Sequence, residues 1–367
     1  PALILLPLAG GIACFLFPAS AKTLGLLTLA LVGLAVVGLG WQLLGHGVYH
    51  HAVGGWGAPL GIDLHADGLS LLMLAMTALV GLGVSLYATG YFKPAHSVRF
   101  WPLWLLLLGA LNALFLSGDL FNLYVTLELI GLSAVALAAL QGGRDALMGA
   151  MRYLLATLLG SLLYLLGVAL LYHGFGTVDL ALLSERVMPS PVAWAVLGLM
   201  SAGLILKTAL FPLHFWLPPA HASAPAPVSA VLSALVVKAS FYILLRLWLA
   251  IFSDISGGVA GLFGLLGAGA VLWGSWQALR QTQVKLLVAY STVAQVGYLF
   301  LAYPLASGMG ATAWSAMAYL ALSHALAKAA MFLAAGNMRQ FGGHDRIADL
   351  DRVVQRLPLT VGAFALA

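Results

Sequence analysis

The chain has 367 residues, of which 62% are hydrophobic and only 7% are charged, and its mean hydropathy is +1.03. A soluble domain carries about 25% charged residues, so this composition excludes a water-soluble globule and makes lipid the solvent for most of the chain. The net charge of +5 does not indicate nucleic-acid binding, because the basic residues lie singly between apolar runs. The single cysteine, Cys14, excludes both a disulfide framework and a cysteine metal site.

A membrane-spanning helix needs about 20 mostly apolar residues, and on that measure the sequence predicts an all-α polytopic protein with eleven spans. They cover residues 3–18, 23–44, 69–91, 101–117, 120–140, 148–171, 192–212, 228–252, 258–278, 286–305 and 313–336. The first run lacks a basic segment and a cleavage site, so we interpret it as a span and not as a signal peptide. A twelfth run opens at Pro358, and we expect the chain to be truncated at both ends.

The basic residues of the connections alternate strongly between the two sides. Arg186 is alone in the even-numbered connections, whereas the odd-numbered ones carry Lys22, Lys93, Arg99, Arg144, Arg152, Arg280, Lys285, Arg339, Arg346, Arg352 and Arg356. Because Lys and Arg gather on the cytoplasmic side, this pattern supports the span count. It predicts a multi-pass protein of the cell inner (plasma) membrane with its N-terminus outside.

A few ionisable residues lie inside the predicted spans, where a charge costs about 2.5–3.5 kcal/mol on insertion scales. These are Glu128, Lys207, Lys238, Arg246, His324 and Lys328. His324 and Lys328 are four residues apart and therefore share a helix face. Such groups can pass a proton, because burial and a neighbouring charge change how tightly each holds it. We therefore expect Glu128, Lys207, Lys238, His324 and Lys328 to form a proton path.

The segment after Lys207 cannot be a regular helix, because five prolines fall within sixteen residues: Pro212, Pro218, Pro219, Pro225 and Pro227. Broken helices at membrane depth are tolerated where the backbone is buried in protein or lines a hydrated cavity, and transporters use them near ion sites. His214 and His221 lie in this segment and are candidates for proton access.

Structural roles compete with these functional ones. Arg246 and Lys285 are candidates for accessory residues of the proton path. For Arg246 we favour a structural role, in which its side chain snorkels to the membrane interface. The structural alternative for Lys285 is a charge that only marks the cytoplasmic side. Asp67 and Asp119 each precede a span, and we interpret them as helix N-caps. His214 could merely pack. A static ion pair between helices is the less favoured reading of Glu128 and Lys207.

Several stretches resemble the proton-translocating antiporter-like family, which includes membrane subunits of complex I, of membrane hydrogenases and of Mrp-type cation/proton antiporters. The stretches are FNLYVTLELIGLSA, LKTALFPLHFWLPPAHASAPAPVSA, LVVKASFYILLR, KLLVAYSTVAQVGY and SHALAKAAMFLAAG, in the family's order. The Pro/His stretch is the most specific. Residues 54–70, GGWGAPLGIDLHADGLS, look most like the D-type Mrp subunit and its hydrogenase relatives.

This resemblance implies a fold of about 14 transmembrane helices, with two inverted five-helix repeats that each contain a discontinuous helix. It divides the chain into N-terminal helices at 1–100, a first repeat at 101–252 and a truncated second repeat at 258–367. It also implies that Glu128 pairs with Lys207, that Lys238 passes protons centrally, and that His324 and Lys328 continue the path.

The resemblance favours a subunit that translocates protons, or exchanges a cation such as Na⁺ or K⁺ for protons, within a hetero-oligomeric membrane complex. The alternatives are the membrane subunit of an inorganic-carbon uptake complex that partners a soluble zinc protein, and a stand-alone secondary transporter. The sequence shows no cysteine cluster and no dinucleotide-binding glycine loop. We therefore expect no cofactor, no metal and no redox or hydrolytic site in this chain. Whether it is a subunit of a redox-driven translocase, of the NADH:quinone oxidoreductase or hydrogenase type, stays open; there, another subunit would handle the electrons.

Overall fold

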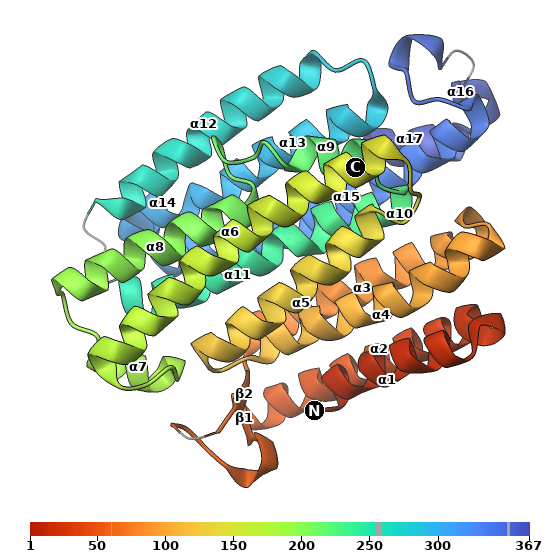
Figure 1. Cartoon of the computed structure of the whole chain (residues 1–367). Helices are drawn as coiled ribbons and strands as arrows, with labels where there is room; N and C mark the ends of the chain where they lie inside the picture. The colour runs from red at the N-terminus through yellow and green to blue at the C-terminus, as the bar shows by residue number, and fades with distance from the viewer. Residues whose placement is uncertain (60, 254, 256–257, 351–352) are drawn as a thin grey trace.

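The computed structural model describes residues 1–59, 61–253, 255, 258–350 and 353–367. These residues form an elongated bundle of membrane-spanning α-helices that lie side by side (Figure 1). Among them, ten helices are long and apolar enough to cross a membrane, and α1, Ala2–Leu16, is a shorter apolar helix. Together they correspond to the eleven predicted spans, and the all-α polytopic membrane fold is confirmed. One basic residue of the predicted loop pattern, Arg352, lies outside the described residues.

The helices before the broken segment are long and mostly continuous. After α1 they are α2 (Ala21–His46), α3 (Gly68–Tyr91), α4 (Pro94–Leu116), α5 (Leu120–Ala138), α6 (Arg144–Phe175), the short α7 (Leu180–Arg186) and α8 (Pro191–Thr208). Proline is tolerated at the first turn of α4 and of α8, where an N–H group has no helical partner anyway.

The later helices include two π-helical turns within one span. They are α9 (Leu217–Ser223), α10 (Ala226–Val231), the π turn η3 (Leu232–Val236), α11 (Val237–Leu247), the π turn η4 (Trp248–Phe252), α12 (Val259–Leu279), α13 (Val284–Phe300), α14 (Ala302–Met309), α15 (Ala311–Gly342), α16 (Val353–Arg356) and α17 (Pro358–Leu366). Short 3₁₀ turns η1 (Pro18–Ser20), η2 (Val53–Gly55) and η5 (Ile347–Asp349) join neighbouring elements.

One end of the bundle carries a small β-hairpin that the sequence did not predict. Strands β1 (Tyr49–Ala52) and β2 (Asp63–Ala66) pair antiparallel, with His50 opposite His65. The backbone of Gly118 donates to the carbonyl of Asp63 and accepts from Leu180, so the hairpin is joined to the ends of α4, α5 and α7. We call this the hairpin end; α16 and α17 lie toward the other end (Figure 1).

The interrupted span is shorter as a helix than we predicted. We expected a helix to residue 212, but α8 ends at Thr208 because Ala209 adopts the left-handed conformation, with φ 58° and ψ 38°. Residues 209–216 leave the helical path before α9 begins. The backbone groups freed by this break find partners inside the protein: the indole of Trp216 donates to the carbonyl of Leu206 at 2.8 Å. The discontinuous helix implied by the resemblance is therefore present.

The span that follows the break is the centre of the bundle. The most apolar stretch of residues 226–252 is entirely buried, whereas the corresponding stretch of α12 is only 28% buried. Its helices contact α3, α4, α5, α8 and α15. Side chains on this span therefore face protein from all directions, and lipid touches mainly the peripheral helices.

Candidate functional site

Glu128 of α5 and Lys207 of α8 meet inside the bundle. The Nζ atom of Lys207 lies 3.3 Å from the Oε1 atom of Glu128, and the side chains are 5% and 22% exposed respectively. Lys207 also donates to the carbonyl of Thr157, at 3.1 Å, and to the hydroxyl of Ser161. The ammonium group therefore has three acceptors, of which only one is charged.

Close packing of α6 against α8 makes this arrangement possible. A Cβ atom on Gly160 would come within 2.7 Å of the Cγ atom of Lys207, and one on Gly203 within 2.3 Å of the carbonyl oxygen of Gly160. Glycine at both positions lets α6 approach closely enough for its carbonyl and hydroxyl groups to reach Lys207. Thr157 and Ser161 were not predicted from the sequence, although small and hydroxylated residues on a membrane helix are a sign of close helix contact.

Lys238 is 1% exposed and lies in the centre of the bundle. Its Nζ atom donates to the carbonyl of Ser233, in the π turn η3, at 3.1 Å. A π turn leaves the regular hydrogen-bonding pattern of the helix, and such turns are frequent at functional sites. The hydroxyl of Ser233 lies 2.8 Å from the hydroxyl of Thr292 on α13, which links this span to the helices that follow.

His324 and Lys328 lie on α15, and both are buried. The ammonium group of Lys328 donates to the hydroxyl of Ser291, on α13, at 2.5 Å. Both ring nitrogens of His324 lack a hydrogen-bond partner among the described residues. Ser291 and Thr292 are adjacent on α13. The hydroxyl of Thr292 contacts Ser233, whose carbonyl accepts from Lys238, and the hydroxyl of Ser291 accepts from Lys328. The structure thus connects α11 with α15 through two neighbouring residues of α13.

The two histidines of the broken segment lie in different surroundings. His221, on α9, is fully buried and stacks on Phe332, and within the described residues neither of its ring nitrogens has a hydrogen-bond partner. His214 precedes α9 and stacks on Phe211 at a centroid distance of 5.8 Å. Their role in proton access stays a prediction.

Lys285, at the start of α13, is 1% exposed. Its Nζ atom donates to the carbonyl of Ala224 at 2.5 Å and to that of Ala222 at 3.4 Å. These carbonyls belong to the end of α9, where the helix leaves its acceptors unpaired and its dipole favours a cation. Lys285 therefore does more than mark the side of the membrane: it holds the broken segment against α13.

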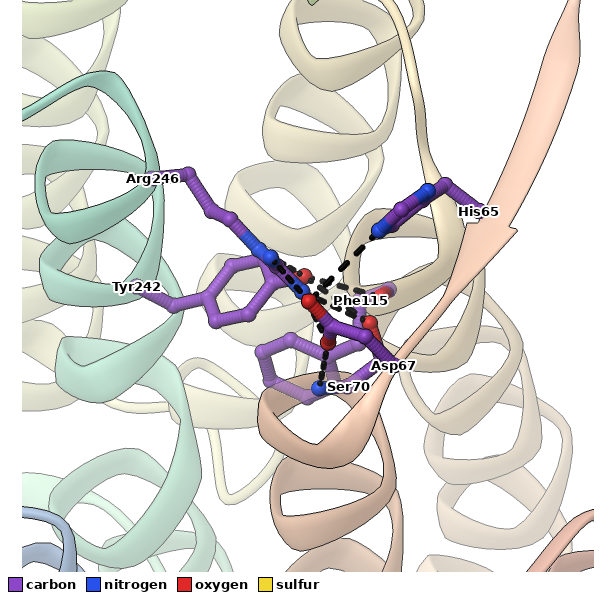
Figure 2. A network of polar contacts seen from close by, with 6 residues as sticks. All are labelled: His65, Asp67, Ser70, Phe115, Tyr242 and Arg246. Carbon is purple, nitrogen blue, oxygen red and sulfur yellow. Dashed lines mark hydrogen bonds and ion pairs between the residues drawn. The ribbon is translucent and has the colours of Figure 1, made fainter. Parts of the chain in front are cut away.

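Arg246 has a partner that the sequence did not reveal. Its guanidinium group does not snorkel alone to an interface: it makes two contacts of 2.5 Å with the carboxylate of Asp67, at the start of α3 (Figure 2). Asp67 and Asp119 are both N-caps as predicted, because they accept hydrogen bonds from the backbone of Ser70 and Asn122. The sequence did not reveal that Asp67 caps a helix and binds Arg246 at once.

The described residues contain no group of three or more His, Cys, Asp or Glu side chains that could hold a metal ion. The residues of the predicted path are instead three lysines, one glutamate and one histidine, and the lysines donate to hydroxyl and carbonyl oxygens of the protein. Such a set can hold and transfer protons, because its basic groups are brought close to neutral acceptors and to one acid.

The chain is similar to known membrane proteins. Residues 117–367 match the family described as NADH:quinone oxidoreductase/Mrp antiporter, transmembrane. Subunit N of the NADH-quinone oxidoreductase of Desulforudis audaxviator is 39% identical over 328 residues, which cover 87% of this chain and 64% of that protein. The D-type subunit of the Na⁺/H⁺ antiporter of Bacillus subtilis is 32% identical, with coverage of 85% and 64%. The chain thus spans a little under two thirds of the length of these curated relatives.

Two solved structures share the fold over nearly the whole chain. A chain of the membrane-bound sulfane sulfur reductase, an archaeal respiratory membrane complex, superimposes with a TM-score of 0.93 and 30% identity, covering 99% of this chain and 76% of that one. A chain of the Mrp complex from a Dietzia species superimposes with a TM-score of 0.91 and 27% identity, covering 99% and 68%.

Proposed function

This chain belongs to the NADH:quinone oxidoreductase/Mrp antiporter transmembrane family, and on that premise we propose that it is a proton-translocating membrane subunit of a multisubunit assembly. The observation that carries the proposal is the contact between Glu128 and Lys207, deep in a bundle of apolar helices. Buried charges in a membrane are expensive and are by default functional. Relatives that match this chain are named as subunits of respiratory complexes and of cation/proton antiporters, which supports a membrane complex with other subunits as partners.

The geometry supports transfer of protons across the bundle from α5 toward α15. When Lys207 loses its contact with Glu128, its neutral acceptors Thr157 and Ser161 remain, so the ammonium group can change partner without leaving the site. Separating the pair changes the proton affinity of both members, because each had stabilised the charge of the other. Lys238, and then Lys328 through the hydroxyls of α13, are the next groups that respond to this change in charge.

We place the hairpin end outside the cell and the opposite end in the cytoplasm. Eleven basic residues against one support this orientation, and the multi-pass fold and bacterial relatives support the inner (plasma) membrane. Cysteine introduced at Gly54 should react with an impermeant thiol reagent added outside, and cysteine introduced at Gly343 with one added inside. Labelling of both positions from the same side would refute the orientation.

The exchanged cation stays open between Na⁺ and K⁺, because relatives are named as Na⁺/H⁺ and as probable K⁺/H⁺ antiporter subunits. Both kinds of name support a proton as one of the ions. The inorganic-carbon and stand-alone alternatives receive no comparable support from these relatives.

A double-mutant experiment tests the proposal. Glu128→Gln should abolish transport while the protein remains in the membrane. Removing one partner of a static buried pair strands a charge and costs about 3–5 kcal/mol, so a merely structural pair predicts loss of protein from the membrane. In the double variant Glu128→Gln with Lys207→Met, abundance should be normal and transport absent, since neither titrating group remains. Recovery of both abundance and transport in that variant would refute the proposed function.

A further inference from the structure

A second ion pair lies two helical turns beyond Lys238, toward the hairpin end, and the proposed proton path does not use it. Arg246 and Asp67 are 179 residues apart in sequence, and the pair joins α11 to α3. The side chains are 15% and 23% exposed. Figure 2 shows Arg246 directed toward the start of α3, with Tyr242 and Ser70 beside the carboxylate.

Further hydrogen bonds hold Arg246 in one position. Its Nε atom donates to the hydroxyl of Tyr242 at 2.9 Å, and one terminal nitrogen donates to the hydroxyl of Ser70 at 2.9 Å. The hydroxyl of Tyr242 in turn donates to the carbonyl of Phe115, on α4, at 2.9 Å. A bidentate guanidinium–carboxylate contact is among the strongest and most directional of polar contacts. Three helices therefore converge on a fixed guanidinium group.

A cavity of about 810 Å³ reaches Arg246 from the hairpin end. Its lining includes the exposed residues Val48 and Ser184, the acids Asp63 and Asp179, and Arg246 itself. Water can enter a cavity of this size, which polar side chains line in part, since a single water needs only about 30 Å³ of liquid volume. Arg246 is thus the point at which a space lined by surface residues meets the packed interior.

Lys238, Tyr242 and Arg246 lie on one face of α11 at intervals of four residues, so Arg246 is about 12 Å from Lys238 along the helix. Tyr242 is 2% exposed and fills the position between them. A proton that entered the cavity would need to pass the fixed positive charge and the tyrosine to reach Lys238. Positive charges in pores exclude protons and cations in this way.

We propose that Arg246, clamped by Asp67, is an electrostatic seal that closes the Lys238 site to protons from the hairpin side. This inference rests on the proposed function, because a seal is needed only where a titrating group in the membrane passes protons. Asp67 acts as a positioning residue that fixes the guanidinium group across the route. Tyr242 fills the remaining space and anchors the guanidinium group to α4.

Passive proton leak tests the seal in vesicles that contain the whole assembly, with a potassium diffusion potential as the driving force and a pH-sensitive dye inside. Arg246→Gln and Asp67→Asn should each raise the leak several-fold over wild type at equal protein abundance. Asn is also a good N-cap, so Asp67→Asn removes the clamp while keeping the start of α3. Arg186→Gln is the matched control, because Arg186 is an exposed arginine at the same end with no carboxylate contact among the described residues.

The added variant Lys238→Met identifies the route of any leak. Combined with Arg246→Gln, it should return the leak to the wild-type value, because the protons would no longer find an acceptor beyond the opened seal. The proposal would be overturned if neither Arg246→Gln nor Asp67→Asn leaked more protons than wild type. It would also be overturned if the leak of Arg246→Gln persisted when Lys238→Met was added. A different result would contradict the proposed function. If Lys238→Met alone left coupled transport intact, Lys238 would not pass protons, regardless of how much the Arg246 variants leak.

Discussion

Among the residues that the structure describes, two acid–base pairs join helices, and they differ in geometry. Lys207 touches Glu128 through a single contact of 3.3 Å and has a neutral carbonyl and a hydroxyl as further acceptors. The guanidinium group of Arg246 makes two contacts of 2.5 Å with the carboxylate of Asp67, and it also donates to the hydroxyls of Tyr242 and Ser70. The first pair can separate without leaving its cation unsatisfied. The second would have to break two charge-assisted contacts at once, and its base cannot give up a proton.

The choice of base agrees with this difference. Lysine is a point charge on a flexible stem and can lose its proton when buried, whereas arginine stays charged and binds a carboxylate as a planar fork. The pair in the proposed proton path therefore uses the base that can change its charge, and the pair at the hairpin end uses the one that cannot. In the roles that we propose, similar ion pairs in one membrane bundle serve opposite purposes: proton movement at Glu128–Lys207 and closure at Asp67–Arg246.

The strongest test of the contrast is Lys207→Arg. Arginine would preserve a positive charge and a contact with Glu128, but it would not release a proton. We expect coupled transport to fall at least about tenfold, equivalent to about 1.4 kcal/mol in a barrier, while the protein stays in the membrane. Transport should be measured together with abundance by quantitative immunoblot. Transport near the wild-type rate would show that Lys207 need not titrate, and the two pairs would no longer differ in kind.

The reverse exchange, Arg246→Lys, should have a smaller effect. Lysine keeps the positive charge but loses the bidentate fork and the hydrogen bond to Tyr242, so the cation becomes mobile. We expect a proton leak between those of wild type and Arg246→Gln, measured with the same vesicles. A leak equal to that of Arg246→Gln would mean that geometry alone closes the route and that charge contributes nothing.

The neutral acceptors of Lys207 provide a finer test. Ser161→Ala removes one acceptor, but the carbonyl of Thr157 remains, so the separated state of the Glu128–Lys207 pair should become only moderately less accessible. We predict transport reduced a few-fold with unchanged abundance. Ser307→Ala, at an exposed position, is the matched control and should transport normally. An unaltered rate in Ser161→Ala would remove the hydroxyl from the proposed mechanism.

The smallest expected effect concerns pH at the hairpin end. Burial alone would raise the pKa of Asp67, but hydrogen bonds from His65 and Arg246, and the charge of Arg246, together hold the pKa below its ordinary value of 3.8. A carboxylate with a lowered pKa keeps its interaction until the pH falls through that lowered value. The ratio of the wild-type leak to the leak of Arg246→Gln should therefore stay constant as the outer pH is lowered from about 8 to about 5. A ratio that rises within this window would show that protonation near Asp67 opens the seal.

Much of the fold followed from the sequence, because membrane spans depend on local composition. Apolar runs of sufficient length predicted the spans, and the basic residues Lys93, Arg144 and Arg280 marked alternate connections without reference to any contact. Clustered prolines predicted the break that follows Lys207, since proline lacks the backbone donor that a helix requires. The meeting of Glu128 with Lys207 came from a family resemblance and not from spacing.

Other features could not be predicted from the sequence because they join distant segments. The hairpin at 49–66 and the pairing of Asp67 with Arg246 depend on how helices pack, and a partner 179 residues away leaves no local pattern. A signal did exist for the pair: an arginine near the end of a span needs an acid, and Asp67 is one of the few acids near the same end. Snorkelling was preferred because it needs no partner, and the structure adds the partner that this interpretation lacked.

The sequence by itself determined which residues lie in the membrane and which connections carry positive charge, because hydrophobic transfer and charge placement act on each segment separately. Only the tertiary structure decided which buried charges touch. It placed two oxygen acceptors of α6 beside Lys207 through the glycines of a close helix crossing, and it set Lys285 against the end of α9. It also clamped Arg246 to Asp67. These contacts depend on distances between helices, which side-chain packing fixes and no single segment contains.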